Sequence, residues 1–124
     1  MPRILGIDWG KARVGLAVSD PTATVARPLA VLDAKKTDTV NEIAGMVERE
    51  HIGAIVIGYP LRWDDRESAR CRDVMGFIKK LRRAVGIPVL VVDEWGTSGG
   101  PGSDAVSAAR ILQYYLDTGD SLNI

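Results

Sequence analysis

The sequences RILGID at residues 3–8 and VGLAV at residues 14–18 decide the fold class of this chain. Both are short apolar runs, and the connection between them contains Gly10. Two such runs with a short glycine-containing connection predict a β-hairpin. Residues 24–32 form a third extended segment, in which Pro28 favours an edge strand or a bulge because proline donates no hydrogen bond to a sheet. The chain is therefore expected to begin with three antiparallel strands.

Helices and buried strands alternate in the rest of the chain. Apolar residues recur at helical spacing over residues 40–47, 74–85 and 108–115. Continuous apolar runs at residues 54–58 and 88–92 separate these helices and indicate strands that are covered on both faces. The expected N-cap residues of the three helices are Thr37 or Asp38, Asp64 and Ser103.

The predicted element order is β-β-β-α-β-α-β-α. A strand–helix–strand connection within one sheet joins parallel strands and is right-handed, so the fold class is α/β with a mixed five-stranded sheet flanked by helices. The RNase H-like fold has this order, and so does each half of the actin-like ATPase fold. A length of 124 residues suits one domain, so residues 1–124 are expected to form a single domain.

Composition excludes several classes of protein. Hydrophobic residues make up 46% and charged residues 26% of the chain, which is typical of a globular domain and not of a disordered or coiled-coil chain. The 16 basic residues balance the 16 acidic ones, so affinity for nucleic acid must come from local clusters. A single cysteine, Cys71, excludes an internal disulfide. No segment resembles a membrane span or a signal peptide, so a cytoplasmic location without membrane contact is expected.

Acidic residues stand where the predicted strands end. Asp8 closes the first strand, Asp93 and Glu94 close the last, and Asp104 lies in the first turn of the final helix. Functional sites of open α/β sheets form at the carboxyl ends of the strands. If the first and last parallel strands are neighbours, Asp8 meets one residue of the Asp93–Glu94 pair, because successive side chains point to opposite faces. Asp104 would then complete the group.

Three carboxylates gathered in this way need a counter-charge, because like charges a few ångströms apart repel each other. Mg²⁺ or Mn²⁺ suits such a site, since these ions take oxygen ligands and are often completed by a substrate phosphate. One or two of them can promote phosphodiester hydrolysis. Taken singly, each acidic residue has a simpler interpretation as a solvated turn residue or a partner of a helix dipole.

The order and spacing of several short motifs resemble the YqgF/RuvX family of Holliday-junction resolvases and pre-16S rRNA nucleases. The similarity extends along nearly the whole chain. The matching segments are GIDWG (6–10), RVGLAVSD (13–20), RPL (27–29), IGYPL (57–61), DE (93–94) and DAVSAARILQYYL (104–116).

This resemblance implies an RNase H-like hydrolase that cleaves branched DNA or precursor rRNA with Mg²⁺ or Mn²⁺. Asp8, Glu94 and Asp104 fall on the catalytic, metal-binding carboxylate positions of the family. The chain departs from the family at Trp95, where relatives usually have arginine, and at residues 96–103, where it has a shortened loop. Both departures remove donors that would contact phosphate.

Basic residues cluster between residues 62 and 83, where eight of them accompany four acidic residues. A nucleic-acid backbone is their expected partner, and the alternative is a solvated helix face on which the opposite charges interleave. Within this cluster every fourth residue from Arg62 to Arg70 is an arginine, and the first hairpin turn holds two further basic residues, Lys11 and Arg13. The residues predicted to bind nucleic acid are Lys11, Arg13, Arg62, Arg66 and Arg70.

Two other functions are also compatible with the sequence. The shortened loop and Trp95 are compatible with a catalytically weakened module that only binds nucleic acid. The sequence IDWG at residues 7–10 also resembles the first phosphate loop of actin-like ATPases, although that fold needs two such domains. A four-way DNA junction as substrate would favour a homodimer, because a two-fold symmetric dimer matches a symmetric junction.

Overall fold

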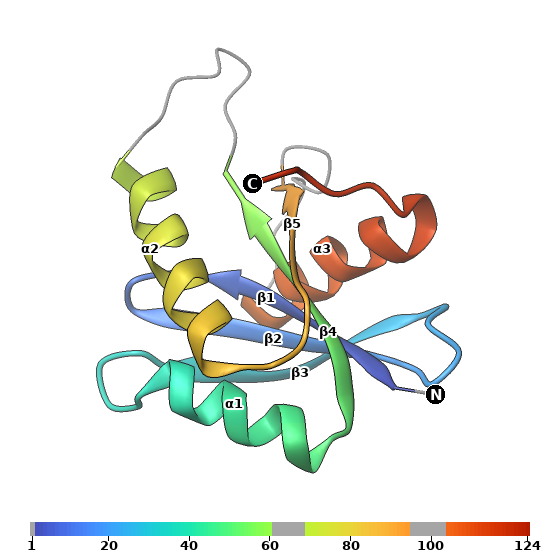
Figure 1. Ribbon diagram of the computed structural model, residues 1–124, viewed down its shortest axis with the longest axis horizontal. Helices are drawn as coiled ribbons and strands as arrows, with labels where there is room; N and C mark the ends of the chain where they lie inside the picture. The colour runs from blue at the N-terminus through green and yellow to red at the C-terminus, as the bar shows by residue number, and fades with distance from the viewer. Residues whose placement is uncertain (1, 61–68, 95–103) are drawn as a thin grey trace.

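A computed structural model describes residues 2–60, 69–94 and 104–124 and shows one mixed sheet between two helical layers (Figure 1). The strand order is β3-β2-β1-β4-β5, with β1 antiparallel to β2, β2 antiparallel to β3, and β1, β4 and β5 parallel. The strands are β1 (Arg3–Trp9), β2 (Arg13–Ser19), β3 (Ala26–Asp33), β4 (Ile52–Tyr59) and β5 (Val89–Asp93). The helices are α1 (Thr39–Arg49), α2 (Ala69–Ala84) and α3 (Asp104–Thr118).

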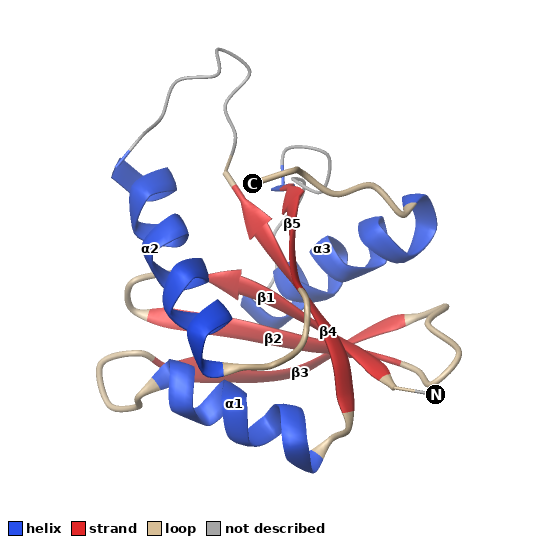
Figure 2. Cartoon of the chain, viewed as in Figure 1, coloured by secondary structure: helices blue, strands red, loops and turns tan. Residues whose placement is uncertain are grey.

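Each face of the sheet has its own core. On one face, side chains such as Leu5, Ile7 and Leu16 pack against α1 and α2 and are fully buried. On the other face, Val56 and Val92 pack against α3. Figure 2 shows this sheet, strongly twisted, with α3 behind it and the other two helices in front. The predicted α/β class, element order and mixed five-stranded sheet are confirmed.

Details of the third strand and the first helix follow from local chemistry. β3 lies at the edge of the sheet, and its register with β2 shifts by one residue next to Pro28. The proline therefore stands both at an edge and beside a bulge, where a missing donor is tolerated. Asp38 caps α1, because its carboxylate accepts a hydrogen bond from the backbone N–H of Asn41. The predicted caps Asp64 and Ser103 lie outside the described residues.

The first and last parallel strands are not neighbours, contrary to the arrangement considered from sequence. β4 lies between them and pairs with both, since its residue Ile57 stands opposite Ile7 of β1 and Val91 of β5. The crossover through α1 carries the chain from the edge strand β3 to β4, beside β1, and the crossover through α2 carries it one strand further from β1, to β5. Any contact between residues at the ends of β1 and β5 must therefore pass over the end of β4.

The part of the chain that the structure describes contains no helix long and apolar enough to cross a membrane.

Candidate active site

Asp8 and Glu94 converge at the carboxyl edge of the sheet and share one cation. Asp8 lies near the end of β1 and Glu94 directly follows β5, with 16% and 22% of their side chains exposed. The guanidinium of Arg70, from the first turn of α2, lies between them. Its Nη2 atom is 3.9 Å from Oδ1 of Asp8 and 3.5 Å from Oε1 of Glu94. The two carboxylates therefore face the same small region of space.

A glycine allows the two carboxylates to meet across the intervening strand. Gly58 of β4 pairs with Val92 of β5 and follows Ile57, the residue that pairs with β1. A Cβ atom at Gly58 would lie 3.1 Å from Oε2 of Glu94 and 2.6 Å from Cδ1 of Ile111. Because glycine has no Cβ, the Glu94 carboxylate can lie over β4, toward Asp8. The motif IGYPL thus has a structural reason for its glycine.

Burial and nearby negative charges make both groups weaker acids than usual. Burial, together with the charges of Glu94 and Asp104 and against the opposing charge of Arg70, raises the pKa of Asp8 to about 6. Burial also raises the pKa of Glu94, against the opposing charge of Arg70 and with a smaller contribution from Asp93. Carboxylates with raised pKa values are stabilised in their charged form by a bound cation. Such perturbed carboxylates are typical of a metal or phosphoryl-transfer centre.

Asp104 approaches the pair from the other side but has its own partner. It is the first residue of α3, and its Oδ2 accepts a hydrogen bond from Nε of Arg13 at 2.8 Å. The start of α3 crosses β2 so closely that a Cβ on Gly15 would collide with the backbone oxygen of Asp104. Gly15 therefore brings Asp104 to the same edge as Asp8. Its charge still raises the pKa of Asp8, so the two groups interact electrostatically.

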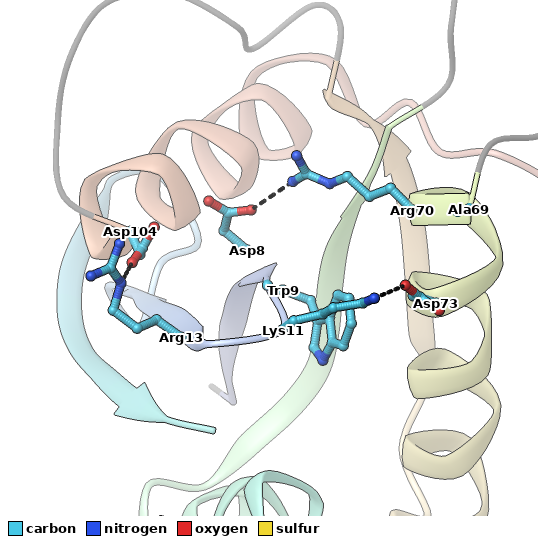
Figure 3. A pocket seen from close by; sticks show the side chains of 9 residues that line it. Asp8, Trp9, Lys11, Arg13, Ala69, Arg70, Asp73 and Asp104 are labelled. Carbon is cyan, nitrogen blue, oxygen red and sulfur yellow. Dashed lines mark hydrogen bonds and ion pairs between the residues drawn. The ribbon is translucent and has the colours of Figure 1, made fainter. Parts of the chain in front are cut away.

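A cavity of about 450 Å³ opens beside these groups. Figure 3 shows that Asp8, Asp104, Arg13 and Arg70 line it together with Lys11, whose Nζ lies 3.3 Å from Oδ2 of Asp73 on α2. Three predicted phosphate-binding residues thus surround the carboxylates, each paired with an acidic group. The predicted Arg62 and Arg66, and the departure at Trp95, lie outside the described residues.

The donor set fits a hard divalent cation. Among residues 2–60, 69–94 and 104–124, no three His, Cys, Asp or Glu side chains gather closely enough to enclose a metal ion. Asp8 and Glu94 form a pair, while Asp104 turns to Arg13. Mg²⁺ commonly binds through one or two carboxylates and keeps waters or substrate phosphate as its other ligands. The pair alone can therefore hold the ion, and the role of Asp104 as a third ligand stays a prediction.

Two features of the site were missed by sequence reasoning. Asp73 forms an ion pair with Lys11. In the sequence it stood out only as one of the acidic residues that lie between the basic residues of the cluster at 62–83. Arg70 was predicted to contact phosphate, which stays a prediction, and its guanidinium also lies within ion-pair distance of both carboxylates. Neither pairing has a sequence signature, because both join residues that lie far apart in the chain.

Comparison with known proteins agrees with this geometry. A family model described as "RuvX: Holliday junction resolvase" matches residues 2–101. A protein of Syntrophus aciditrophicus named "Putative pre-16S rRNA nuclease" is 38% identical, over 93% of this chain and 88% of its own length. A protein of the same name from an Anaeromyxobacter species is 39% identical, over 93% of this chain and 96% of its own. Both alignments span 132 positions, more than this chain contains, so each relative has residues that this chain lacks.

Solved structures show the same fold at low identity. RuvC of T. thermophilus, solved in complex with a Holliday junction substrate, has a TM-score of 0.65 at 16% identity and matches over 98% of each chain. The fowlpox virus Holliday junction resolvase has a TM-score of 0.58 at 12% identity, over 94% of this chain and 99% of its own. Both the resemblance read from the sequence and the RNase H-like fold are therefore confirmed. The chain belongs to the RuvX family.

Proposed function

We propose that this protein is a metal-dependent nuclease that hydrolyses phosphodiester bonds in structured nucleic acid. The observation that carries the proposal is the pair of largely buried carboxylates, Asp8 and Glu94, which meet over Gly58. Cationic side chains surround this pair, as a polyanionic substrate requires. Family membership supports the same reaction class.

Asp8 and Glu94 would hold Mg²⁺ or Mn²⁺ with their facing carboxylate oxygens. When bound, the ion polarises the phosphodiester and lowers the pKa of water. Asp104, on the opposite side of Asp8, is proposed as the third acidic group of the site. It would add negative charge near the ion and orient the attacking water through a hydrogen bond.

The arginines would change partners when metal and substrate arrive. Arg70 neutralises Asp8 and Glu94, and Arg13 neutralises Asp104. A divalent cation supplies that neutralisation more completely, which leaves the guanidinium groups available for phosphate oxygens. Arginine suits this role because its planar fork binds phosphate through two parallel hydrogen bonds. Lys11 lies in the same cavity and would contact the next phosphate along the strand.

Two substrates follow from the comparisons. The curated relatives are named for pre-16S rRNA, and the resolvases of the same fold for Holliday junctions. We propose structured nucleic acid as the substrate class, with the end of precursor 16S rRNA and a four-way DNA junction as its two members. Both would be met in the cytoplasm. Cleavage of a symmetric junction on two strands would additionally require a homodimer.

The test compares cleavage of two labelled substrates, a four-way DNA junction and a precursor 16S rRNA fragment, in Mg²⁺ and in Mn²⁺. The wild-type protein should cut at least one of them, and Asp8→Asn should reduce the rate by at least about a hundredfold, a loss of about 3 kcal/mol in transition-state stabilisation. The control is Asp120→Asn, the same change at an exposed position after α3. Equal background cleavage by wild type and Asp8→Asn on both substrates would contradict the proposal and favour a module that only binds nucleic acid.

A further inference from the structure

A second hollow adjoins the carboxylate cavity. It measures about 800 Å³ and lies between the start of α1, one side of α2 and the turn after β1. We call it the α1–α2 groove. Trp9, Lys11 and Asp73 line both the groove and the carboxylate cavity, so the two hollows share a border. The other lining residues used below are Asp38, Arg72, Gly76, Phe77 and Lys80.

Two exposed cations stand on the α2 wall of this groove. Arg72 and Lys80 are eight residues apart, which places them about 12 Å apart along the helix axis at ~1.5 Å per residue. Gly76 lies midway between them, and a Cβ there would meet nothing within 4 Å, so the surface between the two cations is open at this point. Within the described residues, neither Arg72 nor Lys80 makes an ion pair.

The acidic residues of the groove are already engaged. Asp73 pairs with Lys11 at the border between the two hollows. Asp38 caps α1 and accepts hydrogen bonds from the backbone and side chain of Asn41. The hydrogen bonds from Asn41 leave the charge of Asp38 in place, so the charged residues that line the groove carry an excess of one positive charge, and its α2 wall presents Arg72 and Lys80. Such a surface attracts an anion, and two cations in line attract an extended polyanion.

Two aromatic side chains pack against each other on the side of the groove that faces the carboxylate cavity. The ring of Trp9 packs against Phe77, with their centroids 5.9 Å apart. Trp9 therefore packs on α2 at the border of the two hollows. A chain that passes from one hollow to the other must cross this point, beside Lys11 and Asp73.

We propose that the α1–α2 groove carries one strand of the nucleic-acid substrate away from the carboxylate cavity, with its phosphates on Arg72 and Lys80. This inference rests on the proposed nuclease function. A distance of about 12 Å is within the span of a few nucleotides, since a duplex strand rises ~3.4 Å per nucleotide along its axis. The strand crosses the Lys11–Asp73 pair, and Lys11 holds the phosphate that lies between the two hollows.

The experiment measures binding rather than cleavage. Fluorescence anisotropy with a labelled four-way DNA junction and with a labelled single strand, both in EDTA, compares wild type with the double variant Arg72→Ala/Lys80→Ala. The matched control is Lys79→Ala/Arg83→Ala, which removes two exposed charges from the same helix but outside the groove. The logarithm of the association constant falls as the logarithm of the salt concentration rises. Loss of two phosphate contacts should make this slope shallower by about 1.4–1.8 and weaken binding about 25- to 60-fold at 0.1 M salt.

The control should keep the wild-type salt slope and bind within a few-fold of wild type. An equal loss of affinity and slope in both double variants, or no loss in the groove variant, would overturn the proposed path. Both double variants alter exposed residues and should unfold at the wild-type urea concentration, which shows that any loss is not a folding defect. The readout needs no metal or catalysis, so failure of the nuclease proposal, seen as equal cleavage by wild type and Asp8→Asn, is recognised separately.

Discussion

The charge on Asp8 should make this protein less stable than it could be at neutral pH. The pKa of Asp8 is about 6 in the folded chain, against an ordinary value of 3.8. Between these two values the unfolded chain has released the proton while the folded chain retains it. Stability therefore falls as pH rises from about 4 to about 6, and this cost is fully present above pH 6.

The size of this cost follows from the shift. A change of about two pKa units corresponds to about 3 kcal/mol, at ~1.4 kcal/mol per unit. Since 16% of the Asp8 side chain remains exposed, water screens part of this amount. We expect a measurable cost of about 1–2 kcal/mol. Asp8→Asn, which has nearly the same shape and no charge, should remove it.

Urea unfolding in EDTA at pH 4 and pH 8 measures the effect directly, since changes in midpoint at constant slope report stability. Asp8→Asn should gain about 1–2 kcal/mol over wild type on going from pH 4 to pH 8. The control, Asp120→Asn, should show no such gain. A difference between Asp8→Asn and wild type that does not change with pH, or that turns against Asp8→Asn at pH 8, would refute the assigned burial and repulsion.

Three other substitutions test the geometry around the site. Gly58→Val should clash with Ile111, cost about 1–3 kcal/mol in urea unfolding and weaken Mn²⁺ binding, whereas unchanged stability and binding would argue against the close packing over β4. Gly15→Ala should push the start of α3 off the sheet at a similar cost of about 1–3 kcal/mol, and a variant as stable as wild type would contradict that contact. Arg70→Gln removes the nearby cation and should therefore raise the pKa of Asp8 above 6. In calorimetry, the pH midpoint of Mn²⁺ binding should then move upward. A midpoint that falls or stays the same would show that Arg70 does not contact the pair.

Sequence reasoning predicted the elements of the fold because each carries a periodic signal. Apolar residues at helical spacing and the continuous runs at residues 54–58 and 88–92 correctly predicted the helices and the strands β4 and β5. The proline at position 28 correctly indicated an edge. Strand order is different, since no local pattern states which strand lies next to β1. The placement of β4 between β1 and β5 emerged only from the folded chain.

The site was predictable as a set of residues and not as a set of contacts. Acidic residues that end strands or begin a helix at one edge indicated Asp8, Asp104 and one of the pair Asp93 and Glu94, and the family resemblance singled out Glu94. The structure places Asp8, Glu94 and Asp104 at one edge. Their counter-ions come from distant segments, Arg70 from α2 and Arg13 from the start of β2. Such pairings depend on side-chain reach in three dimensions, which spacing along the chain does not encode.

Calorimetric titration with Mn²⁺ at pH 8 tests the central claim, that Asp8 and Glu94 together form a metal site, most directly. Wild type and Asp120→Asn should bind the ion alike, and Asp8→Asn and Glu94→Gln should each bind it at least about tenfold more weakly, a loss of ~1.4 kcal/mol or more. A titration with a four-way junction present, using Ca²⁺ in place of Mn²⁺ to limit cleavage, should show the same order. Equal Mn²⁺ affinity in wild type, Asp8→Asn and Glu94→Gln would contradict the assignment of the metal to this pair.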